Sequence, residues 1–422
     1  GISDFEKIRR EGFYYIDKTG LVKELLNPKP AEVTLITRPR RFGKTLAMSM
    51  LENFFDIKKN SRDLFAGLEI SASEELCSRW MNQCPTVSLS FRQVDGLDFS
   101  SAYDMLTMVI SNLFNRHRYL LESQEISEFQ KTAFVQIASQ KATAGEIKNS
   151  LILLTDMMQT YYGKKVLLLV DEYDVPVAKA NNNGYYEEML DVMKGLMQAL
   201  KDNRALGFAV VTGCMKIAKE SIFTGTNNFV SDTIADSRLN EYFGFVQREV
   251  DQILADGEIT DKRELIKQWY DGYHFGDWDV YCPWDVMNYV LELQHNPQAK
   301  PAGYWKNTSS NSIIRSFIDF AGNSITRKLE ILMEGGYIIQ QIDKNLTYDY
   351  LHSSEDNLWS VLYLTGYLTQ VRSETLNREL PAGSAALQIP NAEIREIFET
   401  TVIRWFDDSA KTWNRNHLFA AV

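Results

Sequence analysis

Two short stretches of the chain carry residue types that suit the binding and hydrolysis of a nucleoside triphosphate. The first is RPRRFGKT, residues 38–45, which ends in Gly-Lys-Thr as a phosphate-binding loop does. In such a loop, main-chain N–H groups wrap the β-phosphate, a lysine neutralises the terminal phosphates and a hydroxyl holds Mg²⁺. The usual pattern, G-x-x-x-x-G-K-[ST], has glycine where this chain has Arg38, so the match is incomplete.

The loop residues divide the binding tasks among them. Gly43 allows the backbone to approach the phosphates closely, Lys44 supplies the charge and Thr45 supplies the metal hydroxyl. Pro39 can stiffen the turn in place of the missing glycine. An expected helix opens at the loop, so the free N–H groups of its N-terminus would face the anion. The expected nucleotide-binding residues of this stretch are Arg38, Pro39, Arg40, Arg41, Phe42, Gly43, Lys44, Thr45 and Leu46.

The sequence leaves open both whether this loop binds a nucleotide and what its arginines do. Gly-Lys-Thr also arises where a helix simply begins beside incidental basic residues. Arg38, Arg40 and Arg41 could add charge near a triphosphate, pair with acids elsewhere in the fold, or reach a neighbouring subunit. The loop alone does not rank these roles.

The second stretch is LLLVDEYD, in which two acids follow an apolar run. Asp171 can bind Mg²⁺ through water, so Thr45 and Asp171 are the expected metal ligands. Glu172 can orient and deprotonate an attacking water, which makes it a catalytic candidate beside Lys44. Paired acids at the end of a buried strand are costly without a cation or a partner. The alternative is a pair of ordinary acids that face solvent.

Thr212 is the third catalytic candidate, at the end of the next apolar run, FAVVTG. Its hydroxyl could hydrogen-bond the attacking water or the γ-phosphate. A threonine that caps the following turn is an equal alternative.

Apolar runs and helical patterns alternate along the first half of the chain. We expect strands at residues 31–37, 85–91 and 206–213 and in the run 164–177, with helices at 43–57, at 185–203 and through most of 101–162. Runs without polar alternation fit strands that are covered on both faces. This order predicts a doubly wound, parallel α/β sheet with right-handed crossovers, whose ligands bind outside the carboxyl ends of the strands.

The pattern changes after about residue 245. We expect an ATPase-like domain over residues 1–245, a helical, aromatic-rich lid over 246–325, and a small α+β domain over 326–422, for which a winged helix is one form. The aromatic stretch 268–284 lacks interleaved Lys and Arg, so we favour packing over base stacking. His274 in that stretch is expected to be a packed histidine.

Composition limits the function classes. The chain has 422 residues, and its formal charge is 45 − 56 = −11, which argues against a surface that coats nucleic acid or an anionic membrane. The four cysteines form no C-x-x-C pair, so free thiols in a reducing compartment are expected rather than zinc or disulfides. No apolar run approaches about 18 residues, so no membrane span is expected and the cytoplasm is the expected location.

The chain resembles the bacterial AAA-ATPase-like proteins, in which a similar ATPase region often precedes a PD-(D/E)XK nuclease-like domain. The segments that carry this resemblance are YYIDKTGLVKELL, LITRPRRFGKTLAMSMLENFF, LLVDEYDVPV, TGCMKIAKESIFTGTNNF, FGFVQREV, WYDGYHFGDWDVYCPWDVMNY, LWSVLYLTGYLT and IPNAEIREIF. The resemblance implies that the Arg38 form is the normal loop of the family. It further implies an additional-strand P-loop NTPase fold, with ATP and Mg²⁺ as ligands.

The resemblance also assigns residues outside the loop. It places Tyr15, Asp17 and Lys18 near the adenine, or closing the site from the N-terminal side. The chain departs from the family at TGCMK, because relatives often carry Ser-Arg where Met215 and Lys216 stand. Nothing after residue 390 offers a spaced D…E-x-K set with flanking strands, so we expect that this chain alone does not cleave DNA.

Three functional hypotheses follow. In the first, a Mg²⁺-dependent ATPase couples nucleotide state to movement of the C-terminal regions. In the second, a nucleotide-gated switch holds ATP or ADP with negligible turnover and acts on a nucleic-acid or protein partner through its C-terminal regions. In the third, a structural α/β domain binds no ligand. The residues do not separate ATP from GTP or set the oligomeric state, although oligomers are allowed and no membrane partner is expected.

Overall fold

The computed structural model describes residues 2–201, 203–216, 223, 228–305, 323–346, 354–376 and 379–401. The chain forms two compact units. The first comprises Gly1–Arg38 and Gly43–Thr233, and the second comprises Pro39–Phe42 and, among the described residues, the chain from Ile234 onward. The expected lid and small α+β regions thus fall in one unit, while the boundaries at residues 245 and 325 stay predictions.

A five-stranded sheet forms the centre of the first unit. Its order is β2-β3-β4-β1-β5, and every pair of neighbouring strands is parallel. The strands are β1 (Val33–Thr37), β2 (Thr86–Ser90), β3 (Val166–Asp171), β4 (Leu206–Gly213) and β5 (Phe229–Asp232). The first four confirm the strands expected from the sequence, and β5 is an addition. Because all strands run the same way, the residues that end them meet at one edge of the sheet.

The apolar runs form strands because helices cover both faces of the sheet. In β1 and β3 every residue is buried. Leu168 and Val170 of β3 belong to the main apolar core, whereas Phe208 of β4 packs against Phe55 at a ring distance of 5.5 Å. Fully burying an aliphatic or aromatic side chain of this size contributes about 1.5–3 kcal/mol, so such strands are stable only between two layers.

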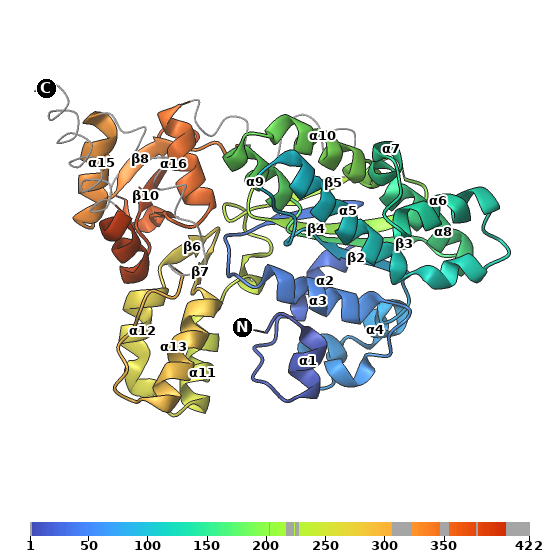
Figure 1. Cartoon of the computed structure of the whole chain (residues 1–422). Helices are drawn as coiled ribbons and strands as arrows, with labels where there is room; N and C mark the ends of the chain where they lie inside the picture. The colour runs from blue at the N-terminus through green and yellow to red at the C-terminus, as the bar shows by residue number, and fades with distance from the viewer. Residues whose placement is uncertain are drawn as a thin grey trace, which may run out of the picture. The chain divides into compact units, whose positions relative to one another are not determined.

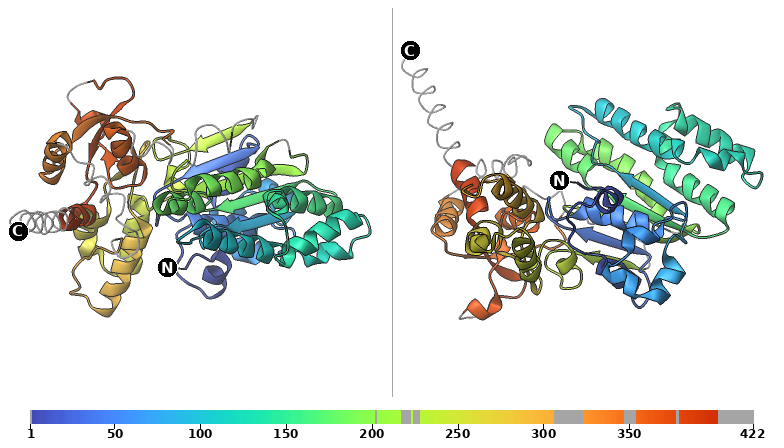
Figure 2. Two further views of the ribbon diagram at one scale, coloured as in Figure 1. Left: turned by 45° about the horizontal axis from the view of Figure 1, so that its top comes forward. Right: turned by 90° about the horizontal axis from the view of Figure 1, so that it is seen from below.

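The two layers are visible in Figures 1 and 2. Helices α1, α3 and α4 lie on one face of the sheet, and α5, α8 and α10 lie on the opposite face. The helices of this unit are α1 (Phe5–Arg10), α2 (Gly20–Leu26), α3 (Lys44–Phe55), α4 (Glu74–Trp80), α5 (Phe99–Asn115), α6 (Glu128–Ala138), α7 (Ala144–Lys148), α8 (Ser150–Tyr162), α9 (Val175–Asn183) and α10 (Tyr186–Leu196). Its short 3-10 helices are Arg62–Phe65, Glu69–Ala72, Arg118–Glu122 and Met197–Leu200.

Helix ends in the first unit follow local capping chemistry. The side chain of Asp98 accepts a hydrogen bond from the N–H of Ser101 at the start of α5, and Ser127 and Thr143 start α6 and α7 with the same kind of capping box. Helix α3 differs, because Gly43 precedes it with φ of 86° and no capping side chain. The N-terminus of α3 is therefore left for another partner.

The second unit is built mainly of helices, an antiparallel hairpin and a small antiparallel sheet (Figure 1). Its described helices are α11 (Gln247–Asp256), α12 (Arg263–Tyr270), α13 (Pro283–His295), α15 (Asn323–Met333) and α16 (Glu355–Leu364), with short 3-10 helices at Asn240–Tyr242, Thr260–Lys262 and Ser373–Thr375. The hairpin pairs β6 (Tyr273–Phe275) with β7 (Trp278–Val280), and the sheet has the order β8 (Ile338–Gln341), β10 (Ser384–Gln388), β9 (Thr369–Gln370).

The aromatic stretch 268–284 packs into the interior of the second unit, as predicted. Tyr270, Tyr273, Phe275 and Tyr281 are each at most 1% exposed. His274 is half-buried, and its Nδ1 lies 3.1 Å from a carboxylate oxygen of Asp279. These rings therefore stabilise the unit instead of forming a stacking surface.

Three further findings concern the described residues. None of their helices has the length and apolar character needed to cross a membrane. The four cysteines are free thiols. No cluster of three or more His, Cys, Asp or Glu side chains among the described residues is arranged to hold a metal ion.

Candidate functional site

The phosphate-binding loop connects β1 to α3. Gly43 adopts the left-handed region, and Lys44 is the first residue of the helix. Lys44 is only 4% exposed, and its Nζ donates a hydrogen bond of 2.8 Å to the main-chain carbonyl of Arg38. The side chain of Lys44 therefore folds back onto the start of its own loop. Its ammonium group lies beside the main chain that would surround a bound phosphate.

Asp171 is the centre of a cluster of hydroxyl groups. The hydroxyl of Thr45 donates to Asp171 Oδ2 at 2.9 Å, and the hydroxyl of Thr212 donates to Oδ1 at 2.6 Å. A third hydroxyl, of Ser90, lies 3.4 Å from Oδ2. The structure thus joins the expected metal hydroxyl to the expected metal carboxylate across 126 residues of sequence.

Ser90 was not anticipated from the sequence. It ends β2, and it lies beside Asp171 in the parallel pairing of β2 with β3. A polar residue at the end of a buried strand was the available signal. Using that signal would have required knowing that β2 and β3 are neighbours.

Glu172 follows β3 directly and has φ of 51°, in the left-handed region that non-glycine residues seldom adopt. Burial raises the pKa of its carboxyl group above the ordinary value, the positive charge of Lys44 opposes this, and the charges of Asp171 and Asp174 add to it. A raised pKa brings a carboxylate closer to the range of an effective general base. The unusual backbone conformation at this position is typical of functional sites.

Asp174 fixes the segment that follows β4. Its Oδ2 accepts hydrogen bonds from the N–H groups of Cys214 at 2.9 Å and Met215 at 3.0 Å. The hydroxyl of Tyr173 donates to the Met215 carbonyl at 3.1 Å, and the Met215 side chain is buried. Asp174, the last acid of DEYD, therefore connects the two strand ends that carry Asp171 and Thr212. Burial raises the pKa of Asp174.

Arg38, an expected nucleotide-binding residue, has a fully buried side chain. Its guanidinium forms an ion pair with the carboxylate of Asp232, and it donates to the carbonyls of Asp232 at 3.0 Å and Thr37 at 2.9 Å. Of the three roles left open for the loop arginines, pairing with an acid elsewhere in the fold applies here. Asp232 carried no signal in the sequence, because it ends the unexpected strand β5.

Residues Pro39–Phe42 of the loop are packed in the second unit. The buried ring of Phe42 lies 5.0 Å from that of Tyr273 and 5.2 Å from that of Phe275. The guanidinium of Arg41 lies over the Trp284 ring at 4.2 Å, and Arg41 has φ of 73°. The side chains of Phe42 and Arg41 thus contact aromatic rings, and the nucleotide contacts expected of these two residues stay predictions. Arg40 is exposed, and Leu46 on α3 is half-buried.

The N-terminal candidates lie on the segment that precedes α2. Asp17 accepts hydrogen bonds from the N–H and hydroxyl of Thr19 at 2.8 and 2.7 Å, and from the N–H of Glu69 at 2.6 Å. The Tyr15 ring packs edge-on against Phe5 at 5.4 Å. These contacts give Asp17 a structural task, while the adenine-side role of Tyr15, Asp17 and Lys18 stays a prediction.

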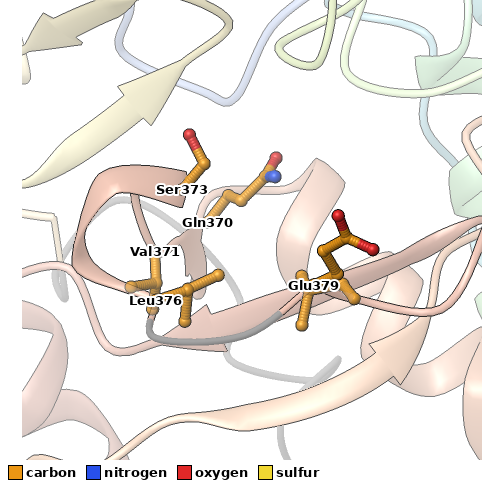
Figure 3. Close-up of a pocket in the computed structure, with 6 residues that line it drawn as sticks. Gln370, Val371, Ser373, Leu376 and Glu379 are labelled. Atoms are coloured by element: carbon orange, nitrogen blue, oxygen red, sulfur yellow. The ribbon is translucent and has the colours of Figure 1, made fainter.

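The described cavities lie elsewhere. One of about 510 Å³ is found in the second unit (Figure 3), lined by Gln370, Val371, Ser373, Leu376, Glu379 and Leu380. A second, of about 470 Å³, includes Asp343, Lys344 and Tyr363 in its lining. Neither cavity contains a loop residue or a member of the Asp171 cluster, so the candidate site rests on hydrogen-bond geometry and not on cavity size.

Two comparisons with known proteins matched this chain. A family model described as "Predicted AAA-ATPase" matches residues 1–223, which is more than half of the 422 residues. The matched span contains the loop, Asp171, Glu172 and Thr212. The "Uncharacterized protein in vnfD 5'region" of Azotobacter chroococcum mcd 1 is 25% identical over 414 residues, covering 97% of this chain and 70% of that protein.

Proposed function

This chain belongs to the predicted AAA-ATPase family, and on that premise we propose that it binds ATP together with Mg²⁺ and hydrolyses it. The hydrogen bond between Thr45 and Asp171 carries this proposal. It brings the hydroxyl of a phosphate-binding loop to a strand-end carboxylate, which is the pair that P-loop NTPases use for the metal.

The donor atoms fit the metal. The hydroxyl of Thr45 and the carboxylate of Asp171 are hard oxygen ligands of the kind that Mg²⁺ prefers, and Asp171 is only 4% exposed. Thr45 and Asp171 would hold the ion, Asp171 through water. When bound, Mg²⁺ supplies positive charge that neutralises the phosphate oxygens.

Three residues of this chain have separate roles in the proposed hydrolysis. Glu172 takes a proton from water as the water oxygen bonds to the terminal phosphorus, and the bond from that phosphorus to the bridging oxygen breaks to release ADP. Lys44 neutralises the charge that develops on the phosphate oxygens. The Thr212 hydroxyl, which donates to Asp171 at 2.6 Å, would orient Asp171 or the attacking water.

The strand order supports assignment to the additional-strand class. Strand β4 stands between β1, which leads into the loop, and β3, which ends in Asp171. Coupling of nucleotide state to the C-terminal regions is part of the proposal, and the packing of Pro39–Phe42 within the second unit supports it. A lid role for residues 246–325 is proposed on the same ground.

The test is a titration of the protein with Mg·ATP, followed by thermal unfolding and by steady-state phosphate release. Ligand at 100 times its Kd stabilises a protein by about 2.7 kcal/mol, so binding gives a clear rise in Tm. Lys44→Ala should lose this rise, and Lys141→Ala, which removes an exposed lysine, should keep it. No rise for the wild type at millimolar Mg·ATP would contradict the proposal. Retained ADP with negligible phosphate release would favour the nucleotide-gated switch.

A further inference from the structure

We propose that Asp232 is a positioning residue for the nucleotide phosphates and that it acts through Arg38 at the start of the loop. The proposal rests on the proposed function, because it assigns a further part of the same site. It gives Arg38 a task other than direct contact with phosphate.

Arg38 is held by four elements of the first unit. Its N–H donates to the carbonyl of Gly213 at the end of β4 at 3.1 Å, and its carbonyl accepts from Lys44 of α3 at 2.8 Å. Its guanidinium reaches the carboxylate and carbonyl of Asp232 in β5 and the carbonyl of Thr37 in β1. Contacts with these four elements therefore hold Arg38 in place at the start of the loop.

A glycine at this place would keep only the main-chain part of that network. The side chain of Arg38 adds a connection to Asp232, which lies 194 residues away in the sequence. That connection holds the peptide whose carbonyl receives the ammonium group of Lys44. Because a bound phosphate depends on the placement of that ammonium group, the ion pair preorganises the site without touching the ligand.

The Arg38–Asp232 ion pair is buried, so each of its two charges depends on the other for stabilisation. Arg38 is 0% exposed and Asp232 is 2% exposed. A buried charge that loses its partner is strongly unfavourable, whereas replacing both partners by apolar side chains of similar volume often preserves stability. The pair can therefore be removed as a unit, which separates its effect on the ligand from its effect on the fold.

The pair could affect phosphate binding through its charge or through positioning of the loop. For the variant Asp232→Asn these two explanations predict opposite changes in affinity. Asp232→Asn leaves the positive charge of Arg38 in place beside the loop. If charge alone mattered, this variant would bind a polyanion more tightly. If positioning matters, it binds more weakly, because the guanidinium loses its charged partner and keeps only neutral acceptors.

The experiment measures Kd for Mg·ATP and for tripolyphosphate, with Tm in the absence of ligand. The variants are Asp232→Asn and the double variant Arg38→Met/Asp232→Leu. We expect both affinities to fall by about tenfold to a hundredfold, in line with the large effects of displacements near 1 Å at such sites. We expect the double variant to keep a Tm near that of the wild type. A matched control, Lys131→Met/Glu128→Gln, removes an ion pair of 3.0 Å on α6 and should change neither affinity.

The measured affinities decide the proposal. Wild-type affinity in the folded double variant, or tighter binding by Asp232→Asn, would overturn it. Should the double variant not fold, the variant Arg38→Lys decides, because it keeps the buried positive charge but loses the guanidinium group that reaches Asp232 and Thr37. A tenfold fall in its affinity would support positioning, and wild-type affinity would contradict it. Failure of the proposed function is distinct, since the wild type would then bind neither Mg·ATP nor tripolyphosphate.

Discussion

Each unit of the chain contains a buried carboxylate site, and the two sites are stabilised by opposite means. In the first unit, Asp171 accepts hydrogen bonds from the hydroxyl groups of Thr45, Thr212 and, weakly, Ser90. In the second unit, the carboxyl groups of Asp285 and Glu393 lie close enough to influence each other's protonation, and both are 0% exposed. Hydroxyl donors supply hydrogen bonds to a carboxylate that can also bind a cation, whereas the burial of two neighbouring carboxyl groups favours a proton held by the pair.

The surroundings of the carboxyl pair favour the shared proton. Burial raises the pKa of Asp285 to about 6. Burial, and next the charge of Asp285, raise the pKa of Glu393 to about 10, although the N–H of Trp305 donates to Glu393 at 2.7 Å. The pair thus holds one proton at neutral pH. Under the proposed function the Asp171 cluster serves a ligand, whereas the Asp285–Glu393 pair keeps a proton in the interior of the second unit.

The largest expected effect that sharpens this contrast is on turnover. Glu172→Gln removes the proposed general base beside Asp171, so we expect the rate of phosphate release to fall by about 10²–10⁴-fold. Binding of Mg·ATP should persist, because glutamine leaves the loop and the metal ligands in place. Measurement of kcat and Kd checks both parts, with the exposed Glu188→Gln as control. Turnover at the wild-type rate would show that Glu172 is not the base.

The next effect concerns the metal. Asp171→Asn replaces the carboxylate of the hydroxyl cluster by a neutral amide, so the Mg²⁺-dependent part of ATP affinity should be lost, a change of about tenfold or more. ATP affinity measured with EDTA should change little. Glu393→Gln is the comparison from the second unit, and it should leave the Mg²⁺ dependence intact. If Glu393→Gln removed the Mg²⁺ dependence instead, the division of tasks between the two sites would be wrong.

The carboxyl pair predicts a pH dependence of stability. A raised pKa in the folded state means that the stabilisation is complete below the unfolded pKa and is lost as pH rises towards the folded pKa. Between about pH 6 and 10 the folded pair keeps a proton that the unfolded chain has released, so the free energy of unfolding falls by up to about 1.4 kcal/mol per pH unit.

Denaturant unfolding at pH 6 to 9 measures this slope. Glu393→Gln replaces the carboxyl group by an amide that does not ionise, so we expect it to flatten the slope and to exceed the wild type in stability at pH 9. Asp156→Asn, at a carboxyl group whose pKa is raised by burial in the first unit, is the matched control and should keep most of the slope. A wild-type slope in Glu393→Gln would show that the pair does not hold the proton.

Features set by local pattern could be predicted from the sequence. The buried apolar runs indicated β1, β3 and β4, the alternating pattern of residues 85–91 indicated β2, and Gly-Lys-Thr indicated the start of α3. Because parallel strands end at a common edge, the meeting of Thr45, Asp171 and Thr212 followed from the same reasoning. The sequence did not predict the hydrogen bonds that Thr45 and Thr212 donate to Asp171, because it assigned these hydroxyl groups to the metal and to the attacking water or γ-phosphate.

Features set by contacts between distant segments could not be predicted. Strand β5 has only four residues, three of them half-buried, so its pattern is weak, and its partner β1 lies far away in the sequence. The pairing of Arg38 with Asp232 depends on that strand. The packing of Phe42 against Tyr273 and the proximity of Asp285 to Glu393 likewise depend on tertiary contacts that no local pattern encodes.

The smallest expected effect tests which hydroxyl groups belong to the Asp171 cluster. The Thr212 hydroxyl is 2.6 Å from Asp171 and buried, so Thr212→Val should destabilise the protein by about 1.5–3 kcal/mol, the range for a hydrogen bond to a charged group. The Ser90 hydroxyl is 3.4 Å away, which is too long for a strong bond, so Ser90→Ala should cost less than about 0.5 kcal/mol. Denaturant unfolding separates these values. If Ser90→Ala were as costly as Thr212→Val, Ser90 would be a full member of the cluster, and Asp171 would be bound by three hydroxyl groups of equal weight.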